Sequence, residues 1–161
     1  MAKTPRSAPP RATYRLQFNQ GFRLSDAAEL VDYFDALGIG ALYTSPLLTA
    51  TPGAAHGYHV TDPTAVNPEV GGEGELAELE AACKRTGMGL VVDIVPNHLA
   101  ASPQNPWWLD VLEHGPASTW AAAFDIDWQE GGGRLVLPIL GHPPREALEE
   151  GELRVALDEG G

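Results

Sequence analysis

The stretch GLVVDIVPNH, residues 89–98, decides the fold expected for this chain. Its near-continuous apolar run over residues 89–95 is typical of a parallel strand that is buried on both faces. Asp93 stands where this strand ends, and Asn97 and His98 follow a few residues later. A carboxylate inside a buried strand would be costly, whereas one at the strand's end can accept hydrogen bonds. The stretch therefore predicts a parallel strand with polar side chains at its carboxyl end.

The segments before this strand alternate between strand and helix patterns. ATYRLQF, residues 12–18, alternates apolar and polar positions and predicts a strand with Arg15 and Gln17 on its polar side. A helix is predicted over residues 25–37. Its expected N-cap is Ser25, and its expected apolar face consists of Ala27, Leu30, Val31, Phe34 and Leu37. ALYT, residues 41–44, predicts a second strand.

A loop and a second helix lead to the third strand. Residues 45–72 are rich in Gly, Pro, Thr and Asn and predict a long loop, which at this length is usually functional or disordered. Residues 73–85 predict a helix with Leu76, Leu79 and Cys83 on its apolar face. The order strand, helix, strand, helix, strand predicts right-handed β–α–β units and a parallel sheet.

The pattern changes after His98. We expect a short helix near residues 106–115, a strand in the alternating AFDIDW of residues 123–128, and a helix over residues 143–150. LRVAL, residues 153–157, could form one more strand. Tryptophans are more often core residues than ligand-binding ones, so all four are expected in the core: Trp107, Trp108, Trp120 and Trp128.

Composition limits the class of function. The 161 residues are 43% hydrophobic, enough for one sizeable core, and their net charge of −12 argues against nucleic acid as a partner. The longest apolar runs are far below the ~18 residues of a transmembrane helix, so no membrane partner is expected. A single cysteine, Cys83, excludes an internal disulfide and fits a reducing compartment. Residues 1–12 lack an apolar secretory segment and are expected to form a disordered leader, which favours the cytoplasm.

Four stretches carry a resemblance to a known family. DIVPNH, residues 93–98, is similar to the first signature region of the α-amylase family, glycoside hydrolase family thirteen. HGYHVTDPTAVNPEVGG, residues 56–72, is similar to the loop after that family's second strand. ATYRLQFNQGF, and SPQNPWWLDVLEHGPAST with AAFDIDW, resemble more narrowly the family's trehalose-forming branch. In this order and spacing, the four stretches together are a strong match.

The resemblance implies an α/β fold, a partial (β/α)8 TIM barrel. It comprises the first three β/α units of the barrel and part of the irregular domain inserted after strand three. Residues 1–12 would then be the leader, residues 13–98 the three strands and two helices of the barrel, and residues 99–161 the start of the inserted subdomain. A full barrel takes about 250 residues, so we expect the chain to be an N-terminal fragment.

For the complete enzyme, the resemblance implies isomerisation of the reducing-end α-1,4 bond of a maltooligosaccharide to an α,α-1,1 bond by intramolecular transglucosylation. The family's nucleophile and acid/base residue lie on later strands, so this chain should hold no catalytic residue and should be inactive in isolation. Hydrolysis of α-glucans and a truncated, catalytically silent carbohydrate-contacting domain are the alternatives. The resemblance implies a maltooligosaccharide as the partner, and neither a metal nor another cofactor.

Four residues, Tyr58, Asp93, Asn97 and His98, match positions with a role in the family, and Asp62 is expected to pin its loop through backbone hydrogen bonds. Tyr58 matches a tyrosine that stacks on the sugar, whose C–H face packs on an aromatic ring. His98 matches a histidine that hydrogen-bonds the sugar's primary hydroxyl, and Asp93 matches a supporting carboxylate beneath the sugar. Asp62 and Asn97 are expected to order their loops. Asn97 matches a position that binds calcium in many amylases, but the trehalose-forming branch is not expected to need calcium.

Two alternatives stay open at this point. Asp93 and Asn97 could instead merely cap a turn, as Asp and Asn residues often do. His56 and His59 are spaced as a pair of metal ligands could be, but a metal site needs three or four ligands and no third is evident. No role is assigned to His59, where relatives more often carry Asp. If the sugar-binding interpretation holds, Tyr58, Asp93 and His98 should converge on one side of the sheet.

Overall fold

The structure is a computed structural model that describes residues 9–137, 139–154 and 156. The chain separates into two compact units, one ending at Asp125 and the other beginning at Ile126. Most of the predicted leader lies outside the described residues, as do residues 155 and 157 of the predicted last strand. No helix in the described part of the chain is long and apolar enough to cross a membrane.

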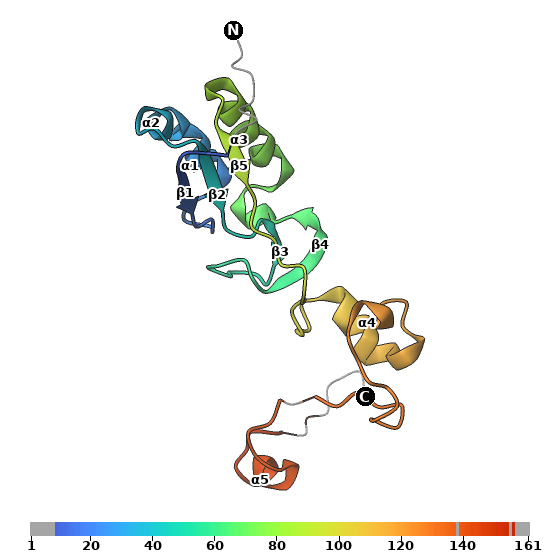
Figure 1. The fold of residues 1–161 in the computed structure, drawn as a ribbon. Coiled ribbons are helices and arrows are strands. Elements are labelled where there is room, and N and C mark those ends of the chain that lie inside the picture. Colours follow the sequence, from blue (N-terminus) through green and yellow to red (C-terminus); the bar gives the residue numbers. More distant parts are fainter. Residues whose placement is uncertain (1–8, 138, 155, 157–161) are drawn as a thin grey trace. The chain divides into compact units, whose positions relative to one another are not determined.

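Three strands of the first unit form a parallel sheet, as the sequence predicts. β1 (Thr13–Leu16), β2 (Ala41–Thr44) and β5 (Gly89–Val91) lie in the order β1-β2-β5 (Figure 1). β5 is shorter than the strand predicted over residues 89–95, and the expected burial of both its faces is wrong, since Val91 is 44% exposed. One face of the sheet is therefore packed and the other is open within the described residues.

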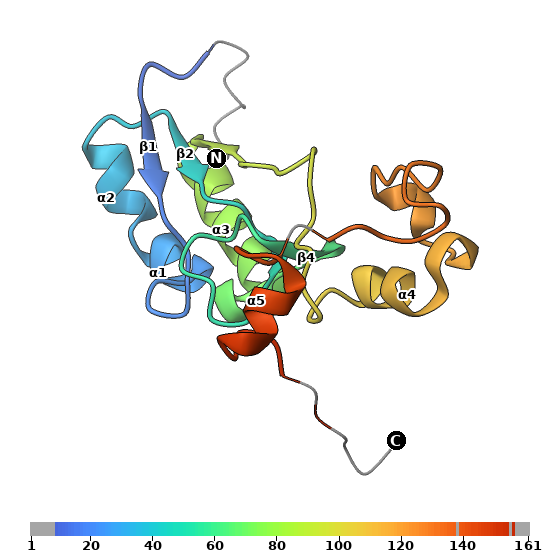
Figure 2. The ribbon, with the colours of Figure 1, turned by 90° about the horizontal axis from the view of Figure 1, so that it is seen from below.

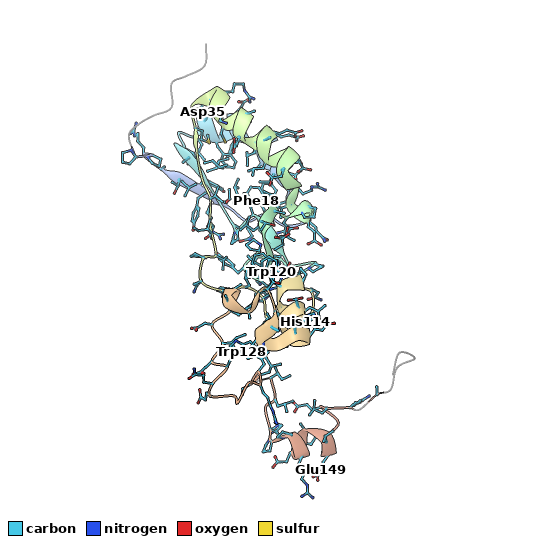
Figure 3. All side chains as sticks on the ribbon, turned by 90° about the vertical axis from the view of Figure 1, so that its right-hand side faces the viewer. Phe18, Asp35, His114, Trp120, Trp128 and Glu149 are labelled. Atoms are coloured by element: carbon cyan, nitrogen blue, oxygen red, sulfur yellow. The ribbon has the colours of Figure 1, made fainter. Side chains whose placement is uncertain are left out.

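Helices cover the packed face of the sheet (Figure 2). They are α1 (Leu24–Glu29), α2 (Val31–Ala36) and α3 (Gly72–Thr86). Figure 3 shows Phe18 in the layer between the strands and α3, where it is 1% exposed. The other buried members of this core are Leu16, Leu24, Ala27, Val31, Phe34, Leu42, Leu47, Val70, Leu79, Ala82, Cys83 and Met88. Each large apolar side chain buried there contributes about 1.5–3 kcal/mol relative to exposure.

The long helix predicted from Ser25 is two short helices, α1 and α2, that meet at Leu30. The N–H of Leu30 bonds to the carbonyl of Ala27 at 3.1 Å, a 3₁₀-type bond that tightens the last turn of α1. The prediction of Ser25 as the N-cap is wrong. The cap is Arg23, whose N–H donates to the carboxylate of Asp26 at 2.6 Å.

The predicted apolar face of that helix is only partly buried. Ala27, Val31 and Phe34 are buried as expected, whereas Leu30 is 39% and Leu37 is 54% exposed. A 3.6-residue period defines one face only along a continuous helix, and α1 and α2 do not form one.

α3 forms where a helix was predicted over residues 73–85. Leu79 and Cys83 are fully buried on its inner face, and Leu76 packs against the core. Gly87 ends the helix with a φ of 76°, a left-handed conformation that glycine adopts without a Cβ penalty. The amphipathic pattern and its terminal glycine were sufficient to predict this element.

An antiparallel hairpin interrupts the long loop predicted over residues 45–72. β3 (Leu48–Ala50) pairs with β4 (Val60–Val66), and the pairing register shifts within β3. β4 also contains Pro63, which cannot donate to a ladder and hides the strand from sequence reasoning. Figure 1 shows the hairpin next to the carboxyl ends of β1 and β2. The connection between its strands, residues 51–59, carries Tyr58 to that end of the sheet.

The remaining helix of the first unit is α4 (Pro106–His114), which was predicted. The buried side chain of Asn105 caps it by accepting hydrogen bonds from the N–H groups of Trp107 at 3.0 Å and Trp108 at 3.4 Å. Trp108 is buried, but Trp120 is 37% exposed and stacks on Trp107 with ring centroids 4.1 Å apart. The prediction of a core position is therefore wrong for Trp120.

The strand predicted over residues 123–128 does not form, and this prediction is wrong. The carboxylate of Asp127 accepts hydrogen bonds from the N–H groups of Gln129 and Glu130, both at 2.9 Å, and so closes a turn. In the second unit α5 (Pro144–Glu149) forms where a helix was predicted. Among the described residues there are also three short 3₁₀ helices, all in the first unit: η1 (Pro68–Val70), η2 (Gly115–Ala117) and η3 (Ala121–Ala123).

Candidate functional site

Polar side chains gather on the open face of the sheet, toward the carboxyl ends of its strands. Arg15 on β1 and Tyr43 on β2 are neighbours in the strand register, and Val91 on β5 is the next partner. The guanidinium carbon of Arg15 lies 5.4 Å from the centroid of the Tyr43 ring, within the range of a cation–π contact. Asp93 follows β5 by two residues, and its carboxylate reaches Arg15 on this same face.

Three of these side chains form a hydrogen-bonded group, the Arg15–Tyr58–Asp93 cluster. The phenol of Tyr58 donates to Oδ2 of Asp93 at 2.6 Å, and Nη2 of Arg15 donates to the phenol oxygen at 3.1 Å. Nη2 of Arg15 also lies 3.6 Å from Oδ2 of Asp93. The cluster joins β1, the hairpin loop and the segment after β5, which are far apart in the sequence.

Two local features of the hairpin loop fix the position of Tyr58. Nδ1 of His56 accepts a hydrogen bond from the N–H of Tyr58 at 3.1 Å, which requires an unprotonated Nδ1. Between them Gly57 has a φ of 74°, and a Cβ there would lie 2.7 Å from the carbonyl oxygen of Pro46. Only glycine fits this position, so the sequence HGY fixes the turn before the tyrosine.

The cluster favours the protonated form of the Tyr58 phenol. The hydrogen bond to Asp93 raises the pKa of Tyr58 above its usual value near 10, and desolvation adds to this rise. The hydrogen bond from Arg15 acts in the opposite direction but does not cancel the rise. At neutral pH the phenol therefore remains protonated and acts as the donor to Asp93.

Asp93 keeps one carboxylate oxygen for another partner. Its side chain is 15% exposed, and Oδ2 is occupied by Tyr58 and Arg15. Within the described residues, Oδ1 accepts no hydrogen bond from protein groups, while the backbone N–H of Asp93 donates to Thr44 Oγ1 at 3.4 Å. The carboxylate bonds to side chains of other segments, so the alternative in which Asp93 merely caps a turn does not hold for this structure.

The other predicted site residues lie outside the cluster. Nδ1 of His98 lies 3.1 Å from Oδ1 of Asn97, and both residues are exposed. In the part of the chain that the structure describes, His98 forms no hydrogen bond with Tyr58 or Asp93. Asp62 accepts hydrogen bonds from the N–H and the hydroxyl of Thr64, at 2.8 and 2.6 Å, and so braces its own strand. The structure thus joins two of the three residues expected to bind the sugar.

The two histidines of the hairpin loop do not form a metal centre. The rings of His56 and His59 meet edge to face with centroids 4.8 Å apart. Among the described residues, no group of three or more His, Cys, Asp and Glu side chains could hold a metal ion. Of the two, His56 contacts Tyr58, through the hydrogen bond to its N–H and through ring packing with centroids 5.8 Å apart.

Sequence reasoning missed Arg15. It recognised the residue only as part of the polar side of a strand. The available signal was the face of the strand. Leu16 and Phe18 point into the core, so Arg15 must point to the other face, which also carries Tyr43 and Asp93. A cation on the polar face of a parallel strand, near an acid that follows another strand, was the pattern to look for.

The family is shown by the sequence itself. A sequence profile described as "Alpha amylase, catalytic domain" matches residues 24–132, which include both the hairpin loop and the segment after β5. The chain belongs to the α-amylase family. Its solved structural neighbours are TIM-barrel enzymes. The described residues of this chain form three parallel strands and no closed barrel.

Within the α-amylase family, the chain is strongly similar to trehalose-forming enzymes. A "Putative maltooligosyl trehalose synthase" of Mycobacterium tuberculosis (strain ATCC 25618 / H37Rv) is 52% identical over 140 residues, 83% of this chain and 18% of the relative. The structure of maltooligosyltrehalose synthase from Arthrobacter ramosus is 50% identical, covers 91% of this chain and 19% of that one, and has a TM-score of 0.82. "Alpha-amylase SusG" of Bacteroides thetaiotaomicron is 33% identical over 87 residues, 54% of this chain and 12% of the relative. The chain thus spans less than a fifth of the length of these relatives.

Proposed function

We propose that this chain is part of a maltooligosyltrehalose synthase, which converts the reducing-end α-1,4 bond of a maltooligosaccharide to an α,α-1,1 bond. The observation that carries the proposal is the 52% identity over 140 residues, which extends beyond the signature stretches into α4 and the segment after it. The α-amylase of Bacteroides thetaiotaomicron reaches 33% over 87 residues. The chain is therefore closer to the trehalose-forming branch than to that hydrolase.

In this proposal the chain supplies sugar contacts rather than the reacting carboxylates. A retaining enzyme of this kind needs two carboxyl groups about 5–5.5 Å apart. Within the described residues, Asp93 instead contacts a guanidinium and a phenol. We assign the nucleophile and the acid/base residue to the rest of the complete enzyme, and Asp93 to support of the sugar.

Three side chains would contact the sugar. The ring of Tyr58 is 37% exposed and offers a face for stacking on the sugar's C–H groups. Oδ1 of Asp93 can accept a hydrogen bond from a sugar hydroxyl. The exposed ring of His98 can donate to the primary hydroxyl. Asn97 would hold the ring of His98, and Asp62 would brace β4, which directly follows the loop of Tyr58. The proposal requires no metal or other cofactor.

The proposed reaction is an intramolecular transfer. The reducing-end glucose would leave with a proton on its O4, while the remaining chain becomes bonded to the enzyme's carboxylate through C1. The same glucose would then attack that C1 with its own O1 hydroxyl, give the hydroxyl proton to the acid/base residue that had protonated O4, and release the carboxylate. Water must be excluded between the two steps, which depends on the shape of the pocket.

Product analysis of maltopentaose tests the proposal. The complete protein should consume the reducing-end anomeric signals in the proton NMR spectrum and produce an α,α-1,1 signal without shortening the chain. Maltopentaitol is the matched control, because its reduced end lacks the anomeric hydroxyl and should not be converted. Shorter maltooligosaccharides with a net gain of reducing ends would instead support the hydrolase alternative. No reaction at all would support the silent carbohydrate-contacting domain.

A further inference from the structure

We propose that Arg15 is a positioning residue, whose guanidinium holds Tyr58 and Asp93 in the arrangement that meets the sugar. The mention of a sugar rests on the proposed function, whereas the positioning itself rests on contacts within the chain. Arg15 touches both residues through one nitrogen, Nη2, at 3.1 Å from the phenol oxygen and 3.6 Å from the carboxylate.

The guanidinium is itself fixed on two further sides. Nη1 of Arg15 donates to Oε1 of Gln17 at 3.0 Å, and the guanidinium lies over the ring of Tyr43. Gln17 in turn donates from Nε2 to the carbonyl of Ala55 at 3.1 Å, in the hairpin loop that carries Tyr58. Arg15 on β1 and Gln17 just after it therefore each hold the hairpin loop by one hydrogen bond. The planar guanidinium of arginine can donate to Gln17 and to Tyr58 at the same time.

Arg15 also decides the direction of the phenol's hydrogen bond. The hydroxyl of Tyr58 has a single proton, and its oxygen accepts a hydrogen bond from Arg15. The proton is consequently left for Asp93, to which it is donated at 2.6 Å. This arrangement uses Oδ2 of Asp93 and leaves Oδ1 to accept a hydrogen bond from a ligand.

The charges of the cluster suit an uncharged ligand. One guanidinium and one carboxylate lie within 3.6 Å of each other, and the phenol between them is neutral. Without Arg15, a carboxylate with 15% side-chain exposure would lack a cationic partner in the described part of the chain. Loss of the arginine should then free the Tyr58–Asp93 pair from β1, because the cationic partner of both is removed, while the hydrogen bond between the phenol and the carboxylate remains.

Kinetics of the complete enzyme give the first test. Arg15→Met should lower kcat/KM for maltopentaose by about 10- to 100-fold, as expected for misplacement of substrate-contacting groups. Arg15→Lys should recover only part of this loss, since an ammonium is a point charge and lacks the fork. Arg85→Met is the matched control, because Arg85 is 60% exposed and pairs with Asp32 on the outer helices; its kcat/KM should stay within about twofold of wild type.

A spectroscopic test separates positioning from folding and needs no substrate. In the complete protein with 3-fluorotyrosine at position 58, the ¹⁹F signal reports the titration of that phenol. Arg15→Met should raise the pKa of the phenol, because the hydrogen bond from Arg15 lowers it. Arg85→Met should leave the signal unchanged.

Four combinations of results decide the inference. A fall in kcat/KM with a raised phenol pKa and an unchanged melting temperature supports it. A fall in kcat/KM that follows a lowered melting temperature, with no change at position 58, overturns it in favour of a general folding role. Unchanged kinetics and an unchanged ¹⁹F titration also overturn it. If wild-type protein does not convert maltopentaose but Arg15→Met still shifts the titration, the proposed function fails while the positioning role stands.

Discussion

Tyr58 lies between an anion and a cation, and this decides what its phenol can do. Its oxygen accepts from Arg15 and its proton goes to Asp93, so both hydrogen-bonding capacities are directed within the cluster. The exposed part of the side chain is then its ring, which is the part that a sugar would cover. Stacking and hydrogen bonding are thus separate contributions of one residue.

Two substitutions at Tyr58 should separate these contributions in the complete enzyme. Tyr58→Phe keeps the ring and loses the hydrogen bonds to charged partners, so kcat/KM for maltopentaose should fall by roughly 10- to 100-fold. Tyr58→Ala also loses the ring and should cost about a further 2- to 10-fold. Steady-state kinetics would measure both. Equal activities for the Phe and Ala variants would contradict a stacking role for the ring.

The site shows what sequence could and could not predict at this scale. Tyr58 and Asp93 stand in motifs whose spacing marks them, and they are found in contact. Arg15 was not predicted as a site residue, because a single arginine in an alternating strand looks like any solvated side chain. Arg15 matters because the folded chain brings it into contact with Tyr58 and Asp93, which are far from it in the sequence.

Cys83 should be chemically inert in the folded chain. Its side chain is buried against the core, and desolvation raises the pKa of the thiol to about 11. At pH 8 only about one thiol in a thousand would be ionised, and the thiolate is the reactive form. We expect no reaction with a chromogenic disulfide reagent in buffer and one equivalent in denaturant. Rapid reaction of the native chain would contradict the burial of Cys83.

At the scale of elements, Glu75 connects two helices. Its carboxylate accepts hydrogen bonds from the N–H of Ser25 at 3.0 Å and from the guanidinium of Arg23 at 2.5 Å. The acceptor is in the first turn of α3, and the donors are at the start of α1. A carboxylate beside a helix N-terminus is favourable, because the first N–H groups of a helix lack partners within it.

The contribution of Glu75 should depend on pH. Hydrogen bonds from Ser25 and the Arg23 guanidinium lower the pKa of its carboxyl below its usual value near 4.5. Stability from this contact should therefore be present above the unfolded pKa and be lost as the pH falls through the folded one. Urea unfolding should show Glu75→Gln less stable than wild type at pH 7, with the difference shrinking toward about pH 3. Glu80→Gln, whose partner Lys84 is exposed, is the control and should show a smaller difference at pH 7.

Elements differ in how far local sequence determines them. α3 was predicted because its periodicity, terminal charges and Gly87 agree. The β3–β4 hairpin was not, because a register shift and Pro63 remove the alternation that marks a strand. The strand predicted over residues 123–128 alternates in sequence but has no partner strand in the described chain, and Asp127 turns the backbone instead.

At the scale of the whole molecule, the sheet of the first unit is open. Within the described residues β1 and β5 are its edges. Apolar side chains near β5 are exposed, with Val91 at 44%, Val92 at 45% and Ile94 at 64%. Unpaired edges and exposed apolar residues favour association with another chain, and the net charge of −12 opposes association without pairing the edges.

The isolated 161-residue chain should therefore associate and be catalytically silent. Size-exclusion chromatography with light scattering should show masses above the 17.1 kDa of a monomer, increasing with concentration. The same material should leave maltopentaose unchanged, since the proposed nucleophile and acid/base residue belong to the rest of the enzyme. A sharp monomer peak with cooperative unfolding would contradict the first expectation, and clear turnover free of complete enzyme would contradict the second.

The central claim is that Tyr58 and Asp93 of the Arg15–Tyr58–Asp93 cluster contact a bound sugar while Arg15 holds them in place. A crystal structure of the complete protein, made inactive by replacing its catalytic nucleophile and soaked with maltopentaose, tests this claim most directly. A glucose unit should pack on the ring of Tyr58 and place a hydroxyl within about 3.2 Å of Oδ1 of Asp93, with Nη2 of Arg15 still on the phenol oxygen. A bound maltopentaose that contacts neither Tyr58 nor Asp93 would contradict the account.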